Sequence, residues 1–235
     1  MMKAVLYGIG VGPGDSELMT LKAINTIKNC DIIAIPSENI ESCVAYNIAK
    51  GAVSEIINKD ILKIHMPMTK DKTILLESHN KGCDIICEQL NKGKTVGFLT
   101  LGDPTIYSTY MYIHKSVKER GYKVSIINGI PSFIAVAAKL DISLVENKEE
   151  LHIIPATYTE EIKDYKGTTV LMKSGKKIAD IKKMLEEKTS GENMVKSFEG
   201  MIENCTMDNE KITLQVENID ELSGYYSTII LKSKD

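Results

Sequence analysis

A short apolar run that leads into four closely spaced glycines opens this sequence and strongly constrains its fold. Lys3–Ile9 is typical of a buried strand, and it runs into the loop Gly8–Asp15, which reads GIGVGPGD. Glycines that follow a strand permit positive φ angles and close approach of backbones. Glu17–Lys28 then carries apolar residues every third position, which predicts a helix with Asp15 or Ser16 as its N-cap.

The alternation of strand and helix continues through the first half of the chain. Further strands are predicted at Asp31–Pro36, Ile61–His65, Thr95–Leu101 and Tyr122–Ile127, and further helices at Glu41–Lys50, Asp71–Asn91 and Thr105–Arg120. This order is typical of a parallel sheet covered by helices. It predicts an N-terminal α/β domain, over residues 1–121, with a mainly parallel sheet.

The pattern changes in the second half, which has more strands and shorter helices. Strands are predicted at Leu151–Pro155, Thr168–Met172, Met194–Phe198, Lys211–Val216 and Tyr225–Leu231, and helices at Pro131–Leu140 and Lys176–Glu187. This composition favours a mixed sheet. We therefore expect a second α/β domain over residues 122–235, with the boundary near Gly121.

The first glycine loop does not fit the dinucleotide-binding motif G-x-G-x-x-G. A motif that starts at Gly8 requires a glycine where Pro13 stands, and one that starts at Gly10 requires a glycine where Asp15 stands. Proline also lacks the N–H group that a pyrophosphate would accept. The spacing alone leaves two interpretations open, a ligand-binding loop and a glycine-rich turn.

Two more loops follow predicted strands. Gly102-Asp103-Pro104 follows the strand Thr95–Leu101, and a loop that begins with Asn128-Gly129 follows Tyr122–Ile127. Ligands of α/β sheets collect at the carboxyl ends of the strands, where Asp103 could accept hydrogen bonds from a hydroxyl or an amine. The alternative is that Pro104 is only the first residue of a helix.

Charge and composition exclude several classes of protein. The formal net charge of −3 argues against a dedicated nucleic-acid binder, which needs a basic excess. No run approaches the ~18 apolar residues of a membrane span. Arg120 is the single arginine, so a bidentate clamp on an anion could come only from that residue.

Cysteines and histidines give no sign of a metal centre or a disulfide framework. The five cysteines are scattered, which favours reduced thiols and a cytoplasmic location: Cys30, Cys43, Cys83, Cys87 and Cys205. One helical turn separates Cys83 from Cys87, and helix packing explains that pair better than a metal site does. The four histidines show no ligand spacing: His65, His79, His114 and His152.

Taken together, the loops resemble those of the tetrapyrrole (class III) S-adenosylmethionine-dependent methyltransferases. Gly8–Asp15 resembles the family signature G-x-G-x-G-P-G-D, and Leu101–Pro104 resembles the family's G-D-P loop. Gly129–Ser132 resembles its third loop and Val170–Lys173 a later strand end. The segment Gly102–Tyr110 is most similar to members that methylate C20 of precorrin-2 or of its cobalt form, cobalt-factor II.

The resemblance implies two α/β domains with S-adenosylmethionine in the cleft between them, a homodimer, and a tetrapyrrole substrate. Residues implied in binding the methyl donor, and its product S-adenosylhomocysteine, are Pro13, Leu101, Gly102, Asp103, Ile106, Pro131, Ser132 and Met172. Tyr107 and Tyr110 would line the substrate trough. Methyl transfer depends mainly on alignment of donor and acceptor, so no nucleophile–base pair is implied. The resemblance assigns no residue to removal of the C20 proton.

Other functions stay open at this point. A sister methyltransferase could act at another ring carbon or on another substrate, such as a modified elongation factor. A nicotinamide-dependent oxidoreductase and a non-catalytic binding module are alternatives from other classes. The sequence also leaves open whether the substrate carries cobalt.

Overall fold

Two α/β units make up the chain in a computed structural model, which describes residues 4–67, 69, 71–158, 165–189 and 196–233. Unit 1 is Met1–Pro131 and unit 2 is Ser132–Asp235, and each is built on one five-stranded sheet. The division falls after the predicted boundary at Gly121. The reason is that Lys123–Ile127 pairs with the first strand of unit 1 and so belongs to its sheet.

All strands of the unit 1 sheet are parallel, as predicted, in the order β3-β2-β4-β1-β5. The strands are β1 (Val5–Gly10), β2 (Ile32–Ile35), β3 (Asp60–Lys63), β4 (Val96–Thr100) and β5 (Lys123–Ile127). Because β1 lies between β4 and β5, the loops that follow these three strands start side by side at one edge of the sheet.

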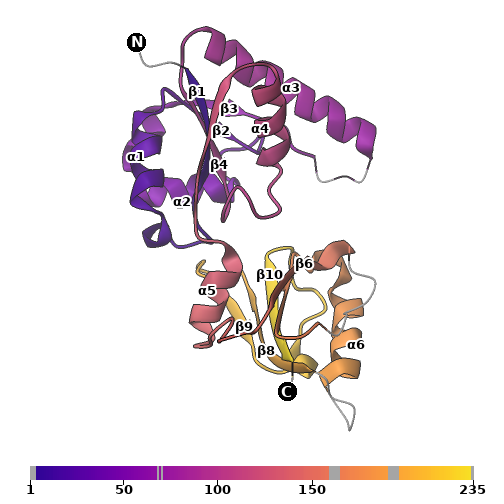
Figure 1. Ribbon diagram of the computed structural model, residues 1–235. Coiled ribbons are helices and arrows are strands. Elements are labelled where there is room, and N and C mark those ends of the chain that lie inside the picture. Colours follow the sequence, from indigo (N-terminus) through magenta and orange to yellow (C-terminus); the bar gives the residue numbers. More distant parts are fainter. Residues whose placement is uncertain (1–3, 68, 70, 159–164, 190–195, 234–235) are drawn as a thin grey trace. The chain divides into compact units, whose positions relative to one another are not determined.

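Helices cover both faces of this sheet (Figure 1). They are α1 (Leu21–Asn29), α2 (Val44–Ala52), α3 (Lys72–Asn91) and α4 (Tyr110–Glu119). Successive strand residues point to opposite faces. Ile33 and Ile35 therefore pack in one core cluster with α1 and α2, whereas Ile32 and Ala34 pack in another with α3 and α4.

The first helix begins later than the sequence predicts. Thr20 is its N-cap, and the Thr20 hydroxyl accepts a hydrogen bond from the Ala23 N–H at 3.1 Å. Asp15 caps a separate single turn, Ser16–Leu18, by accepting a hydrogen bond from the Glu17 N–H at 2.8 Å. The predicted helix Glu17–Lys28 is thus two elements with two caps.

The helix predicted at Thr105–Arg120 also begins late, at Tyr110. Tyr107 has a φ of +46°, in the left-handed region, which a continuous right-handed helix does not contain. Pro104 is therefore a loop residue, and the interpretation that Asp103-Pro104 begins a helix is wrong.

The sheet of unit 2 is mixed, as predicted, in the order β6-β7-β10-β8-β9. Its strands are β6 (Leu151–Pro155), β7 (Thr168–Met172), β8 (Lys196–Glu203), β9 (Lys211–Thr213) and β10 (Ser227–Ser233). Only β6 and β7 pair in parallel among these strands, and the other pairs are antiparallel. Ile229 and Leu231 of β10 share a core cluster with α6 (Ile178–Thr189), while α5 (Ser132–Lys139) contacts β10 through Ser132 and Thr228.

Short 3-10 helices are also found in the described residues: Ser54–Asn58, Ala156–Tyr158, Gly175–Lys177 and Val216–Asn218. The last of these takes in Val216, so the strand predicted at Lys211–Val216 ends at Thr213. The first residues of two predicted strands, Lys3 and Met194, lie outside the described residues.

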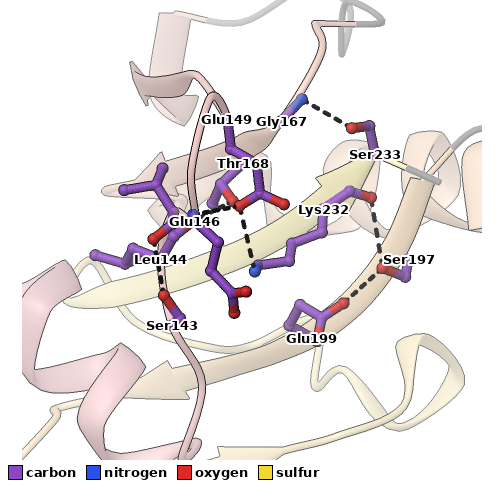
Figure 2. A network of polar contacts seen from close by, with 11 residues as sticks. Ser143, Leu144, Glu146, Glu149, Gly167, Thr168, Ser197, Glu199, Lys232 and Ser233 are labelled. Carbon is purple, nitrogen blue, oxygen red and sulfur yellow. Dashed lines mark hydrogen bonds and ion pairs between the residues drawn. The ribbon is translucent and has the colours of Figure 1, made fainter. Parts of the chain in front are cut away.

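Polar contacts fasten the connection before β6 to the unit 2 sheet (Figure 2). The Thr168 hydroxyl donates to the Leu144 carbonyl, and the Lys232 Nζ lies 3.7 Å from the Glu149 Oε2. The same Glu149 oxygen accepts a hydrogen bond from the Glu146 N–H at 2.8 Å. These side chains serve the packing of the connection against β7 and β10.

All five cysteines are free and buried, in agreement with the predicted reduced thiols. Burial raises the pKa of Cys30 and of Cys205 to about 12. Cys83 and Cys87 lie on the buried face of α3 and belong to its core cluster, in line with the helix packing predicted from their spacing. Within the described ranges, no helix combines the length and the apolar character that crossing a membrane requires.

Candidate functional site: a junction of three glycine loops

The loops that follow β1 and β4 are joined backbone to backbone. The Gly102 N–H donates to the Gly12 carbonyl at 2.8 Å, and the Gly12 N–H donates to the Gly102 carbonyl at 3.3 Å. The Val11 N–H donates to the Thr100 carbonyl at 3.0 Å. These two N–H groups of the first loop are therefore bonded to carbonyls of the second loop. That use weakens the dinucleotide interpretation, in which they would face a pyrophosphate.

The loops after β4 and β5 meet above β1, although β1 separates the two strands. A Cβ atom on Gly10 would lie 2.6 Å from both the Gly102 carbonyl oxygen and the Gly129 nitrogen. A Cβ atom on Gly129 would lie 2.2 Å from the same Gly102 oxygen. Any side chain at either position would collide with backbone. We call this contact of Gly10–Pro13, Thr100–Asp103 and Asn128–Pro131 the loop junction.

One buried carboxylate connects the second loop to the third. Asp103 Oδ1 accepts hydrogen bonds from the Thr105 N–H and hydroxyl, at 2.8 and 2.5 Å. Asp103 Oδ2 accepts from the Asn128 side-chain amide at 3.1 Å and from the Gly129 N–H at 3.0 Å. The residue is 5% exposed. Each oxygen already has two donors, so the carboxylate joins the loops, and a direct contact with a ligand is not needed to explain it.

The same contacts keep Asp103 ionised. Burial by itself raises the pKa of this carboxyl, but the hydrogen bonds from Thr105, Asn128 and Gly129 outweigh burial and lower it below its usual value. The junction therefore holds a fixed negative charge whose hydrogen-bonding capacity is filled by the protein.

The other donor-site residues predicted in unit 1 lie on or beside the junction. Pro13 is buried directly after Gly12, and Leu101 is half-buried against the core cluster of α1 and α2. Ile106 is half-buried in the loop that follows Asp103. Gly102 has a left-handed φ of +69°, and a Cβ atom there would meet nothing closer than the Pro131 Cα at 3.8 Å. The absent side chain leaves a small space beside Pro131, which we call the Gly102 cradle.

The two tyrosines predicted to line a substrate trough differ in exposure. Tyr107 is 41% exposed. Tyr110 is fully buried, and the centroid of its ring lies 5.2 Å from that of Phe98. The ring also lies over Gly8, so that a Cβ atom on Gly8 would be only 1.9 Å from a ring carbon. Burial raises the pKa of Tyr110, and its hydroxyl lies 3.0 Å from His114 Nδ1. Tyr110 is a core residue, so the prediction of a trough role for it is corrected.

The predicted residues of unit 2 are joined through β10. The Ser132 hydroxyl lies 3.2 Å from the Thr228 hydroxyl, and Thr228 is the pairing partner of Met172. Met172 in turn pairs with Pro155 at the end of β6. These residues, far apart in sequence, therefore lie at one edge of the second sheet.

The same edge holds two buried polar atoms that the sequence did not indicate. Ser174 follows β7 and Glu203 ends β8, where it pairs with Ser227. One Glu203 oxygen accepts a hydrogen bond from the Gly224 N–H at 2.8 Å. The other Glu203 oxygen and the Ser174 hydroxyl have no hydrogen-bond partner within the part of the chain that the structure describes.

The described ranges contain no group of three or more His, Cys, Asp or Glu side chains that could hold a metal ion. The histidines have local contacts that explain them. His65 and His152 each lie 3.1 Å from a glutamate oxygen, and His79 stacks on Tyr112 with ring centroids 4.7 Å apart. The prediction that the four histidines are structural agrees with these contacts.

Two residues of the junction, and one residue that bonds to it, were given no role from the sequence. Gly10 and Asn128 stood in the quoted loops without a role, and Thr20 lay inside a predicted helix. The dipeptide Asn128-Gly129 indicates a turn. No local pattern could indicate that the Asn128 amide meets a carboxylate from another loop.

The sequence profile of the tetrapyrrole (corrin/porphyrin) methylases matches residues 5–222. A probable cobalt-precorrin-2 C(20)-methyltransferase of Methanocaldococcus jannaschii is 37% identical over 233 residues, covering 97% of this chain and 95% of that protein. The chain belongs to the tetrapyrrole methylase family.

More distant members of the methylase family also match along most of the chain. A precorrin-2 C(20)-methyltransferase of Sinorhizobium sp. is 26% identical, covering 96% of this chain and 94% of that protein. Two other Methanocaldococcus jannaschii proteins, a probable cobalt-precorrin-7 C(5)-methyltransferase and a cobalt-precorrin-4 C(11)-methyltransferase, are 28% and 24% identical. They cover 90% and 87% of this chain, and it covers 89% and 75% of them.

A solved structure supports the fold. The X-ray structure of a cobalt precorrin-4 methyltransferase superimposes with a TM-score of 0.73 at 19% identity, covering 97% of this chain and 94% of that one. The two-unit α/β architecture of this methylase is thus the one its family uses.

Proposed function

We propose that this methylase transfers a methyl group from S-adenosylmethionine to C20 of precorrin-2 or of cobalt-factor II, in the biosynthesis of cobalamin. One observation carries the choice of carbon. Three of the relatives come from Methanocaldococcus jannaschii and are named for methylation of different ring carbons. This chain is 37% identical to the one named for C20, and 28% and 24% identical to those named for C5 and C11. Because the organism is the same, distance between organisms does not explain the difference.

The loop junction supports the choice of methyl donor. Bound S-adenosylmethionine would supply a methyl group already activated on a sulfonium, so the main task of the protein is to align donor and acceptor. The cradle at Gly102 leaves room beside Pro131 where a ligand can approach the loops. We assign Pro13, Leu101, Gly102, Ile106 and Pro131 to contacts with the donor, and Asp103 to the positioning of the loops that supply them.

Unit 2 supplies the remaining assigned residues. We assign Ser132 and Met172 to the donor as well, because Gly129–Ser132 and Val170–Lys173 resemble loops of the family; within unit 2, Thr228 joins the two residues at one sheet edge. For the tetrapyrrole we retain Tyr107, which follows the junction and is exposed, and not the buried Tyr110. A homodimer and a cytoplasmic location are further parts of the proposal, and size-exclusion chromatography with light scattering tests the first.

Transfer of an isotopic label tests the function. Purified protein is incubated with S-adenosylmethionine labelled with ¹³C in its methyl group and, in parallel, with precorrin-2 or cobalt-factor II. We expect one labelled methyl group, located at C20 by NMR, and the faster of the two reactions identifies the natural form of the substrate. Label at another ring carbon would make the protein a sister methyltransferase, and no transfer to either substrate would overturn the proposal.

A matched pair of variants connects this activity to the junction. Gly129→Ala places a methyl group against backbone, whereas a Cβ atom on Gly121 meets no atom within 4 Å. We expect Gly121→Ala to retain transfer and Gly129→Ala to lose it.

A further inference from the structure

Asn128 is an exposed residue whose side chain reaches a buried carboxylate of another loop. Its amide Nδ2 donates to Asp103 Oδ2 at 3.1 Å, and its own carbonyl accepts a hydrogen bond from the Thr20 hydroxyl at 3.3 Å. Thr20 is also the N-cap of α1. Asn128 therefore connects the start of α1, the second loop and the third loop at one point.

The third loop needs such a connection because of where its strand lies. Neighbouring strands are about 4.8 Å apart, and β1 separates β4 from β5, so the two loops start roughly 10 Å apart. They nevertheless touch above Gly10. Among the described residues, the hydrogen bonds that cross from the third loop to the second are those that Asp103 Oδ2 accepts from Asn128 and Gly129.

We propose that Asn128 is a positioning residue for the methyl donor: its amide holds the third loop against Asp103 and thereby sets the place of Pro131 beside the Gly102 cradle. The inference rests on the proposed function, because it takes this junction as the donor site. Asn128 acts through Asp103 and is not itself a ligand.

The chemistry at position 128 is specific. The Asp103 oxygen requires a donor, which the amide of asparagine supplies and an aspartate in its ionised form does not. The other groups that bond to the Asp103 carboxylate come from Thr105 and Gly129, and the Thr20 hydroxyl bonds to the backbone carbonyl of Asn128; none of these groups carries a charge. An aspartate at 128 would place a second carboxylate about 3 Å from the first, which raises the pKa of the pair so that the two share a proton in mild acid.

Binding of S-adenosylhomocysteine, measured by calorimetry at pH 7.5 and pH 5.5, tests the proposal. We expect Asn128→Ala to bind about tenfold more weakly than the native protein at both pH values, through loss of a charge-assisted hydrogen bond. We expect Asn128→Asp to bind at least tenfold more weakly at pH 7.5 and to recover most of that loss at pH 5.5. In turnover, KM for S-adenosylmethionine should rise while kcat at saturating donor changes less than threefold.

Asn47→Asp is the matched control. The Asn47 amide donates to the Glu41 carbonyl, away from the junction, so this variant should bind like the native protein at both pH values. The proposal is overturned if Asn128→Asp binds within twofold of the native protein at pH 7.5, or if its loss is the same at both pH values. If the native protein binds no S-adenosylhomocysteine, the proposed function fails, and that result is separate from any effect at Asn128.

Discussion

The two sheet edges that carry the assigned residues are built in different ways. In unit 1 the edge is joined by backbone, with Gly10, Gly102 and Gly129 in contact and one carboxylate that has four donors. In unit 2 the edge is joined by side chains and strand pairing, and it buries a hydroxyl of Ser174 and an oxygen of Glu203 without described partners. Among the described residues, the carboxylate of the first edge has all its donors within the protein, whereas two buried polar atoms of the second edge have no partner.

The way in which each edge is held together explains why a sequence pattern predicts the first edge and not the second. Contact between backbones requires glycine, because any Cβ atom would collide, and the requirement leaves a fixed spacing of glycines in the chain. Contact between side chains can be made by many residue pairs, so it leaves no comparable pattern. We expect substitutions to be costly at the first edge and mild at the second.

The largest effect is expected from Gly129→Ala. The new methyl group would lie 2.2 Å from the Gly102 oxygen, with backbone atoms of Gly10 at 2.8 and 2.9 Å, so the junction must open. We expect the free energy of unfolding, measured with urea, to fall by about 3 kcal/mol. Gly121→Ala adds only the strain of a left-handed residue with φ +87°, about 1–2 kcal/mol. Equal losses in the two variants would contradict the role given to the junction.

The next effect is expected from Asp103→Asn, which removes the charge and leaves one oxygen as acceptor. The free energy of unfolding at pH 7 should fall by about 2 kcal/mol. Because the folded pKa is lowered, the contribution of this carboxylate is present above its unfolded pKa of about 3.9 and is lost as the pH falls through the folded value. The difference between native protein and variant should thus be constant from pH 7 to 5 and shrink below pH 4. A difference that grows in acid would show the opposite shift.

A smaller effect separates two serines, one at each edge. The Ser108 hydroxyl lies 3.0 Å from the Thr100 hydroxyl and accepts from the Tyr110 N–H at 3.2 Å, so Ser108→Ala should cost about 1 kcal/mol. The buried Ser174 hydroxyl has no described partner, so Ser174→Ala should leave stability within about 0.5 kcal/mol or raise it. If urea denaturation shows that Ser174→Ala destabilises the protein more than Ser108→Ala does, the difference described between the two edges is wrong.

The smallest difference between the units is expected in their thiols. Burial raises the pKa of Cys30 in unit 1 and of Cys205 in unit 2 to the same value of about 12. Native protein at pH 8 should therefore react slowly with a thiol reagent at all five cysteines, and fast after denaturation. Rapid reaction of one thiol would reveal local opening of its unit.

Features that depend on a short stretch of sequence were predicted correctly, and features that depend on contacts between distant residues were not. The parallel and mixed sheets follow from runs of a few residues and are as predicted. The starts of α1 and α4 are not: Asp15 caps a separate single turn and Thr20 caps α1, and the left-handed Tyr107 prevents a continuous helix before α4. The end of unit 1 was placed too early, because nothing local shows that Lys123–Ile127 pairs with β1.

The amino-acid sequence was enough to predict the alternation of strands and helices, the three glycine loops and the family resemblance, because apolar periodicity and glycine spacing are local properties of the chain. Only the tertiary structure decided that Tyr110 is core, that Asp103 is saturated by its own protein, and that Asn128 meets it. Each of these depends on which strand lies beside which. With β1 between β4 and β5, residues distant in sequence come within hydrogen-bonding distance, and no local pattern records that order.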